Sequence, residues 1–487
     1  MSALRSGGVP GWRTASTSAV VAGLLGALSL PSWGWWPLGV VAVAGLSVAL
    51  RDRSARARAL VGAAFGVGLF VPGLWWMGEF NAAGAALVVV LETAFLALAA
   101  AAVPRRRGAA LALPGVLVVA EAARAAVPFG GLPMAGLALG QAGSVLGGSA
   151  RVGGPLLVLG LVAVGGVALA AALARRWLPA AVALGVGLAG VASGLVAPDG
   201  GSGPGLDAAA VQGGGRRGFQ GDGGDDPDEV FARHLATSQG VRTPVDLVVW
   251  PEDVIDVDGP IERYPEGALV AAVARRSGAT LVAGVVESVG PDRFRNAAVA
   301  WSRDGTVVDR FEKVRRVPFG EYVPGRAFFD LFADLSPIPR DAIAGRGPGI
   351  LDTPAGRLGV MVSYEVFFAD RARGAAGAGS RLLLVPTNAA SFSTSQVPSQ
   401  QLASARLRAI ETGRDLVQAA PTGYSAVVDH RGRVLARSVL GRRQVLHHRV
   451  TLRSGRTLYV RVGDAPVVAL AAVALAAGWA ARRGDPE

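Results

Sequence analysis

The sequence predicts a polytopic membrane protein of about eight helical spans, with a layered α/β domain inserted before the last span. Three observations support this fold class. Of the 487 residues 51% are hydrophobic and 17% charged, against about 25% charged in ordinary soluble domains. Long apolar runs fill the chain as far as Pro198 and recur near its C-terminus. Between them, short apolar runs alternate with amphipathic segments, which is typical of an α/β domain.

Each apolar run approaches the roughly 20 residues that cross a bilayer as a helix. The expected spans are 15–31, 35–50, 59–77, 82–103, 108–126, 152–174, 178–197 and 464–481. The sequence therefore divides into a seven-span domain at 1–198, an α/β domain at 199–463, a C-terminal span at 464–481 and a tail at 482–487.

Arginine clusters occupy alternate loops between these spans. They comprise Arg5 and Arg13, Arg51 to Arg58, Arg105 to Arg107, Arg175 and Arg176, and Arg482 and Arg483. Because basic loops stay in the cytoplasm, the tail at 482–487 is expected inside and the domain at 199–463 outside the cytoplasmic membrane. The same clusters account for the net charge of +12, so nucleic acid is not an expected partner. A monomer is expected.

The chain has no cysteine and only four histidines. The absence of cysteine excludes disulfides, thiol nucleophiles, iron–sulfur clusters and cysteine-ligated zinc. The four histidines do not favour a histidine-rich metal site. No metal and no cofactor is therefore expected.

The α/β pattern begins after a Gly- and Asp-rich stretch at 198–226, which reads as a linker with a possible strand at 207–212. Strands are expected at 247–250, 280–287, 296–301, 357–363 and 381–386, with a turn at Asp304-Gly305 and paired strands around Arg431-Gly432. Helices are expected at 266–278, from about 365, and at 398–413.

Glu252, in Trp250-Pro251-Glu252, follows a buried strand. Loops at strand ends are where α/β folds place reactive groups, and a carboxylate there can serve as a general base. The alternative is a solvated acid at a strand end.

Lys313 is the only lysine in the chain. It lies just before a loop that two prolines bracket, Val317-Pro-Phe-Gly-Glu321-Tyr-Val-Pro324. Arginine cannot easily replace lysine in proton handling, so a single lysine among many arginines suggests a specific role for its ammonium group. The alternative is a surface lysine beside a structural turn.

Ser363 ends an apolar strand and precedes a helix, in Ser363-Tyr364-Glu365. A nucleophile at such a turn is expected to be exposed, and the helix N-terminus favours developing negative charge. The alternative is a helix N-cap serine. A Ser–His–Asp hydrolase is a rival, but the sequence contains no G-x-S-x-G motif.

Taken together, these motifs resemble the apolipoprotein N-acyltransferase family over nearly the whole chain. Its membrane half is matched by LPSWGWWPL (30–38), FGVGLFVPGLWWM (65–77) and EAARAAVPFGGLPMAGLALGQ (121–141). Its external domain belongs to the nitrilase superfamily, an αββα sandwich with a Glu–Lys–Cys triad. Trp-Pro-Glu, Phe-Glu-Lys-Val with Val-Pro-Phe-Gly-Glu-Tyr, and Val-Ser-Tyr-Glu are the matching motifs, and 405–414 resembles the segment that follows the nucleophile.

The resemblance implies a two-step acyl transfer. Ser363, at the nucleophile position, would take an acyl chain from membrane phospholipid and pass it to the N-terminal amine of a diacylglyceryl-modified lipoprotein. Glu252 would be the general base and Lys313 would stabilise the oxyanion. Glu321, Tyr364 and Glu365 would support the site.

The sequence departs from the family pattern at three places. Ser363 replaces the family's cysteine, and an alcohol is harder to deprotonate than a thiol. Asn388 to Phe392 lacks an acid and a tryptophan, and Phe219 is the nearest substitute for an aromatic residue in an earlier loop. Three hypotheses follow: a serine acyltransferase, a catalytically silent protein that binds lipid or lipoprotein, and a nitrilase-like phospholipase or amidase.

Overall fold

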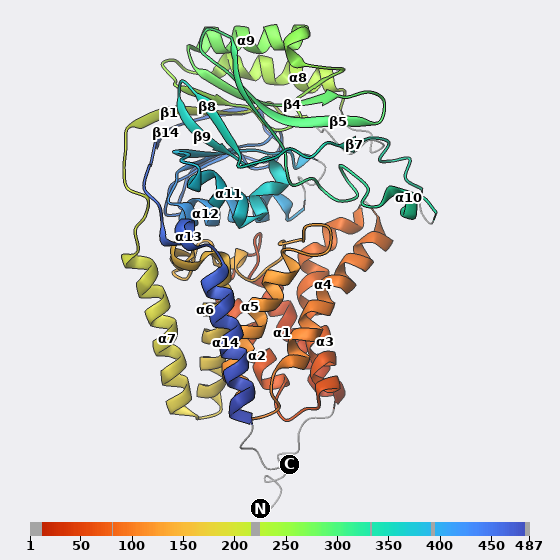
Figure 1. The fold of residues 1–487 in the computed structure, drawn as a ribbon, viewed down its shortest axis with the longest axis vertical. Helices are drawn as coiled ribbons and strands as arrows, with labels where there is room; N and C mark the ends of the chain where they lie inside the picture. The colour runs from red at the N-terminus through yellow and green to blue at the C-terminus, as the bar shows by residue number, and fades with distance from the viewer. Residues whose placement is uncertain (1–11, 80, 216–224, 332–333, 391–394, 483–487) are drawn as a thin grey trace, which may run out of the picture. The chain divides into compact units, whose positions relative to one another are not determined.

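The computed structural model describes residues 12–79, 81–215, 225–331, 334–390 and 395–482 (Figure 1). It forms two compact units, Met1–Val196 with Asp464–Glu487, and Ala197–Gly463. Several predicted features lie outside the described residues, namely Arg5, Phe219, the Ser391-Phe392 pair, and the tail at 482–487 beyond Arg482.

The first unit is helical. Its α-helices are α1 (Trp12–Leu28), α2 (Pro37–Ala49), α3 (Ala55–Leu74), α4 (Ala82–Ala102), α5 (Ala109–Arg124), α6 (Ala150–Leu173), α7 (Trp177–Val196) and α14 (Ala465–Arg482). Each expected span thus coincides with a helix. Among the described residues, four segments are long and apolar enough to cross a membrane: Ala55–Glu79, Ala82–Ala102, Gly147–Leu173 and Trp177–Val196. The chain is therefore a polytopic membrane protein, while the number of eight spans and their orientation remain predictions.

Small residues let these helices pack closely. A Cβ atom on Gly23 of α1 would lie 2.1 Å from the Phe65 carbonyl oxygen of α3, and one on Gly68 of α3 would lie 2.3 Å from the Val20 carbonyl oxygen of α1. Helices in lipid associate through such close backbone contact, because apolar burial from water is not available to drive them together.

A buried arginine organises the end of α5. Arg124 Nε donates to Glu92 of α4 at 2.5 Å, and its Nη1 donates to Glu121 at 2.9 Å. Its Nη2 donates to the carbonyl oxygens of Leu132 and Met134, at 3.1 and 2.6 Å. One guanidinium therefore joins two helices to the segment that follows α5.

The second unit contains two sheets. In its described residues, one sheet has the strand order β14-β1-β2-β4-β5-β6, with β3 paired to β4 and β7 paired to β5, and the other has the order β13-β12-β11-β10-β9-β8. The first comprises β1 (Gly205–Gln212), β2 (Leu247–Val249), β3 (Ile255–Val257), β4 (Thr280–Ser288), β5 (Arg293–Trp301), β6 (Val307–Glu312), β7 (Asp341–Ala342) and β14 (Gln444–Thr451). The second comprises β8 (Ile350–Thr353), β9 (Gly356–Val360), β10 (Leu382–Pro386), β11 (Leu416–Ala419), β12 (Ala426–Val428) and β13 (Val434–Arg437).

The two sheets stack face to face between pairs of helices. Alternate side chains, such as Leu247 and Val249 of β2 and Leu382 and Leu384 of β10, fill one core between the sheets. Val248 of β2 points the other way, into a core with α8 (Pro227–Thr237) and α9 (Pro265–Ser277). Figure 1 shows α11 (Ala369–Gly377) and α12 (Val397–Thr412) beyond the second sheet. Two short helices, α10 (Arg326–Phe329) and α13 (Leu458–Val462), complete this αββα sandwich.

Most of the predicted strands and helices of this unit are confirmed. The possible strand at 207–212 is β1, which lies between β14 and β2 in the sheet. Strands β8 and β11 were not predicted. The strand expected at 357–363 ends at Val360, and a 3₁₀ turn at Ser363–Phe367 separates it from α11. Helix α8, which begins at Pro227 directly after the Gly- and Asp-rich stretch, was not predicted from the sequence.

Candidate active site

The loop after β2 buries Glu252. β2 is parallel to both β1 and β4, so its carboxyl end lies at the edge where α/β folds place reactive groups. The ring nitrogen of the preceding Trp250 donates to Ser238 Oγ at 3.0 Å, which fixes the start of the loop. Glu252 is only 4% exposed, so the alternative of a solvated acid is wrong.

Lys313 follows β6 and is also buried. Its backbone N–H donates to the Asn296 carbonyl oxygen at 2.8 Å. Its ammonium donates to Glu252 Oε1 at 2.8 Å and to Glu321 Oε1 at 2.7 Å. At 2% exposure, it is not the surface lysine of the alternative interpretation. Glu252, Lys313 and Glu321, predicted from two separate segments, therefore form one ion cluster.

Asn296 completes this cluster and was missed by the sequence analysis. Its side-chain amide donates to Glu252 Oε1 at 2.9 Å and to Glu321 Oε1 at 3.3 Å. The residue is buried on β5, whose following positions, from Ala297 to Trp301, are all apolar and buried. The sequence signal that could have identified Asn296 is a single amide side chain at the start of this apolar run.

Burial and charge act in opposite directions on Lys313. Burial alone would lower its pKa, but the carboxylates of Glu252 and Glu321 outweigh that effect and raise the pKa above the ordinary lysine value. The side chain is thus a fixed cation across the physiological pH range. It can bind an oxyanion but cannot act as a neutral nucleophile.

Ser363 is the first residue of the 3₁₀ turn that follows β9. Its φ of +49° is unusual for a residue with a side chain, and such backbone strain is concentrated at functional sites. The residue is 7% exposed, so the expectation of an exposed nucleophile is wrong. The N-cap alternative is also wrong, because Val362 is the N-cap residue and the Ser363 hydroxyl faces Thr387.

Two further polar residues contact the serine in series. The Thr387 hydroxyl donates to Ser363 Oγ at 3.2 Å. The Gln401 side-chain amide in turn donates to Thr387 Oγ1 at 2.8 Å. Neither residue was singled out from the sequence, in which Thr387 reads as a strand end and Gln401 as one polar position of a helix.

Glu365 connects the segment of Lys313 to the segment of Ser363. This fully buried carboxylate accepts backbone hydrogen bonds from Val314 and Arg315, both at 3.1 Å, and from Val362 at 2.9 Å. Burial raises its pKa, while the nearby Arg371, 3.1 Å away, opposes the rise. Tyr364 is buried beside it and packs edge-on against Phe368, with ring centroids 5.0 Å apart.

Among the described residues, the side chains of the candidate site thus form two hydrogen-bonded groups. One is the ion cluster, and the other is Ser363 with its hydroxyl and amide partners. Within the described chain no hydrogen bond joins Ser363 directly to Glu252, Lys313 or Glu321, and Glu365 is the side chain that bonds to the backbone beside both groups.

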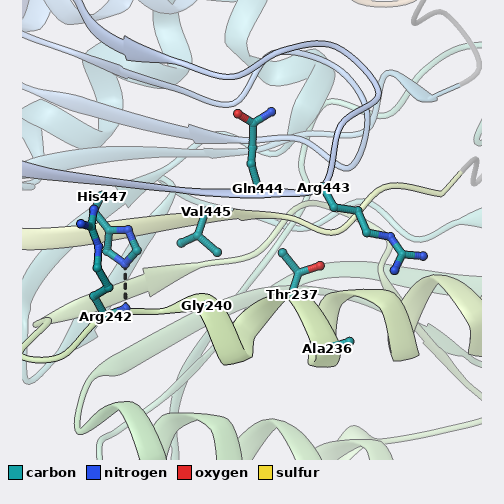
Figure 2. A pocket seen from close by; sticks show the side chains of 8 residues that line it. All are labelled: Ala236, Thr237, Gly240, Arg242, Arg443, Gln444, Val445 and His447. Atoms are coloured by element: carbon teal, nitrogen blue, oxygen red, sulfur yellow. Dashed lines mark hydrogen bonds between the residues drawn. The ribbon is translucent and has the colours of Figure 1, made fainter.

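A separate depression lies on the same unit. Its volume is about 470 Å³. Figure 2 shows the residues that line it, namely Ala236, Thr237, Gly240, Arg242, Arg443, Gln444, Val445 and His447. The backbone N–H of Arg242 donates to His447 Nε2 at 2.9 Å. None of these residues belongs to either group of the candidate site.

The chain matches two family models. Residues 22–168 match the apolipoprotein N-acyltransferase N-terminal domain, and residues 207–458 match the carbon-nitrogen hydrolase domain. The second match covers more than half of the chain, and all of the predicted site residues fall within it.

Two named relatives match this chain over nearly its full length, and a third matches about half of it. An apolipoprotein N-acyltransferase from Azotobacter vinelandii is 33% identical over 98% of this chain and 96% of its own. One from Pseudomonas putida is 30% identical over 98% of both chains. A third, from Geobacter metallireducens, is 38% identical over 49% of this chain and 46% of its own. The chain therefore belongs to the apolipoprotein N-acyltransferase family.

Proposed function

We propose that this protein transfers an acyl chain from membrane phospholipid to the N-terminal amine of diacylglyceryl-modified lipoproteins, through an ester on Ser363. The observation that carries the proposal is the ion cluster of Glu252, Lys313 and Glu321, in which Glu252 and Lys313 are buried. The nearly full-length likeness to named N-acyltransferases supports it. In this proposal the domain at 199–463 acts on the outer side of the cytoplasmic membrane.

In the first step, Ser363 Oγ attacks the carbonyl carbon of a phospholipid ester while its proton passes to Glu252. The carbonyl oxygen becomes an oxyanion, which the Lys313 ammonium stabilises. The bond from the carbonyl carbon to the glycerol oxygen then breaks. Glu252 returns the proton to that oxygen, which yields a lysophospholipid and acyl-Ser363.

In the second step, the α-amine of the lipoprotein cysteine attacks the acyl-Ser363 carbonyl. Glu252 accepts a proton from the amine as the new C–N bond forms. The bond between the carbonyl carbon and Ser363 Oγ breaks, and the proton passes to Oγ. The products are an N-acylated lipoprotein and the free serine.

Glu321 and Glu365 have supporting roles in this proposal. Glu321 and the Asn296 amide hold Lys313 and Glu252 at hydrogen-bond distance. Glu365 and Tyr364 hold the turn that carries Ser363. Such fixed surroundings let the reacting groups meet without reorganisation at the moment of reaction.

An acyl-transfer assay in liposomes tests the proposal. Native protein, Ser363→Ala and Ser363→Cys receive phospholipid and a diacylglyceryl-cysteine peptide, and both peptide product and acyl-enzyme are measured by mass spectrometry. Ser277→Ala is the matched control, because Ser277 is 8% exposed against 7% for Ser363 and its hydroxyl bonds, among the described residues, only to carbonyls of its own helix.

The proposal expects peptide acylation by native protein and by Ser277→Ala, and none by Ser363→Ala. If Ser363→Cys is the only variant that acylates the peptide, the fold supports catalysis but the native chain has a binding role. Lysophospholipid release without acylated peptide would instead assign a phospholipase reaction.

A further inference from the structure

We propose that Thr387 and Gln401 form a hydrogen-bond relay that stabilises Ser363 as an oxygen nucleophile. Thr387 touches the reacting atom and is therefore a catalytic residue, whereas Gln401 acts through Thr387 as a positioning residue. The inference rests on the proposed function and specifies how a serine can serve where a thiol would be the stronger nucleophile.

Strand topology brings the two hydroxyls together. β9 and β10 are parallel neighbours, with Leu358 opposite Leu382 and Val360 opposite Leu384. Parallel strands end at the same edge of a sheet, so the segments that follow them lie side by side. Ser363 follows β9 and Thr387 follows β10, which gives the 3.2 Å contact between their hydroxyl oxygens.

The hydrogen-bond donors fix the direction of the relay. A hydroxyl has one proton to donate and two lone pairs that accept. The Gln401 amide donates to Thr387 Oγ1, and Thr387 donates its single proton to Ser363 Oγ. Ser363 then accepts from Thr387, and its own proton stays available for transfer to a base.

Burial strengthens this arrangement. Thr387 is fully buried, and Gln401 and Ser363 are 4% and 7% exposed. In such a low-dielectric site hydrogen bonds are stronger and polarise one another. The Ser363 hydroxyl oxygen needs no water as a hydrogen-bond donor, because Thr387 supplies one.

The relay acts at the two moments when negative charge forms on Ser363 Oγ. Charge grows when the Oγ proton leaves for Glu252 during attack on the phospholipid ester. It grows again when the bond between Oγ and the acyl carbon breaks during transfer to the amine. A donated hydrogen bond to an oxygen anion is strong, whereas sulfur is a weak acceptor. The relay should therefore assist Ser363 far more than a cysteine at the same position.

That difference provides the first test. Thr387→Val removes the hydroxyl at nearly constant shape, and Thr387→Ser keeps it. Each is made in the native chain and in Ser363→Cys, and kcat and KM for peptide acylation are measured. Thr387→Val is expected to lower kcat about 10- to 100-fold in the native chain and less than about 3-fold in Ser363→Cys, with KM unchanged. Thr387→Ser should retain most of the rate.

The same loss in both backgrounds would overturn the relay, because a merely structural role does not distinguish oxygen from sulfur. Thr422→Val is the matched control. Thr422 is a buried threonine of the same unit whose hydroxyl has no hydrogen-bond partner among the described residues, so its loss should change neither background.

Gln401→Glu tests the direction of the relay. An ionised carboxylate accepts the Thr387 proton and thereby withdraws it from Ser363, so the rate should fall at least as far as in Thr387→Val. When the carboxyl is protonated it can donate again, and the rate should recover as pH falls. A Gln401→Glu rate and pH profile equal to those of the native protein would overturn the proposed direction.

A reaction that needs no lipoprotein separates this inference from the proposed function. A water-soluble p-nitrophenyl ester acylates the nucleophile directly, and intact mass reports the acylation rate. If native protein forms acyl-Ser363 but no acylated peptide, the acceptor assignment fails while the Thr387 and Gln401 comparisons still decide the relay. If Ser363 is not acylated by the ester while Ser363→Cys is, the relay is overturned.

Discussion

Gly284 of β4 lies against the backbone of Glu252. A Cβ atom on Gly284 would come within 2.4 Å of Glu252 Cα and 2.5 Å of the Pro251 carbonyl oxygen. Both are backbone atoms that no side-chain rotation can move away. The glycine therefore allows the loop after β2 to lie across β4, and the Gly284 N–H donates to the same Pro251 oxygen at 3.0 Å.

Gly284→Ala should displace Glu252 and reduce acyl transfer. Overpacking of this kind costs about 1–3 kcal/mol, and a general base moved by about 1 Å can lose on the order of 100-fold in rate. Thermal unfolding and peptide acylation measure the two effects. Gly374→Ala is the control, because Gly374 lies in α11 with open space around its Cβ position. Native-like rates in Gly284→Ala would show that Glu252 does not need this position.

Lys313→Met should be strongly destabilising. It leaves the buried carboxylate of Glu252 and the partly buried carboxylate of Glu321 without their cation, and breaking a buried ion pair from one side costs about 3–5 kcal/mol. The double variant Lys313→Met/Glu321→Gln removes one charge of each sign and should recover part of the lost stability. Denaturant unfolding in detergent measures both. The ion cluster would be unimportant to the fold if the single variant unfolded like the native protein.

Sequence patterns pointed to the acidic and basic residues of the candidate site because each sits in a short, specific motif beside a predictable strand. Asn296 was missed because its role depends on β5 lying beside the loops of Glu252 and Glu321, a pairing between distant segments. Thr387 was missed for a similar reason. Its contact with Ser363 requires that β9 and β10 be parallel neighbours, which hydrophobic periodicity does not specify.

Burial was the property that sequence predicted least well. Ser363 was expected to be exposed, and solvated alternatives stood open for Glu252 and Lys313, yet all three are buried. Polar residues are ordinarily placed at the surface in a sequence-based interpretation. Burial of several charges together becomes favourable only when partners from different strands meet, as the ammonium and carboxylates do here.

His234 should make the second unit sensitive to acid. Its Nδ1 donates to the Val230 carbonyl oxygen at 2.7 Å, and its Nε2 accepts from the Gly213 N–H at 3.1 Å, so the folded ring is neutral. Burial lowers its pKa to about 4, whereas an unfolded histidine has a pKa near 6.5. The unfolded chain therefore gains a proton first as pH falls. The free energy of unfolding should decrease by up to about 3 kcal/mol between about pH 6.5 and pH 4.

Unfolding measured across this pH range checks the prediction. His234→Gln keeps one donor and one acceptor without the titration, so its stability should lose most of this acid dependence. His448→Gln changes a partly exposed histidine of β14 and should retain it. Equal acid dependence in His234→Gln and the native protein would contradict the assignment.

Arg124 should be indispensable to the helical unit. Its guanidinium is 1% exposed and bonds to Glu92, Glu121 and two backbone carbonyls that follow α5. Arg124→Leu leaves two carboxylates without their cation, at a cost of about 3–5 kcal/mol. Arg124→Lys keeps the charge, but one ammonium has three donors against five and cannot reach all four partners. Its loss should be smaller but measurable.

Thermal unfolding in detergent, with limited proteolysis of residues 125–138, distinguishes these variants. Arg124→Leu should unfold at the lowest temperature and expose that segment to protease, because the carbonyls of Leu132 and Met134 lose their donor. Arg105→Lys is the control, since Arg105 is exposed and such substitutions usually change stability by less than about 0.5 kcal/mol. If Arg124→Lys matched the native protein in both measurements, charge alone would account for the role of Arg124. The planar guanidinium would then not be required to connect α4, α5 and the segment beyond them.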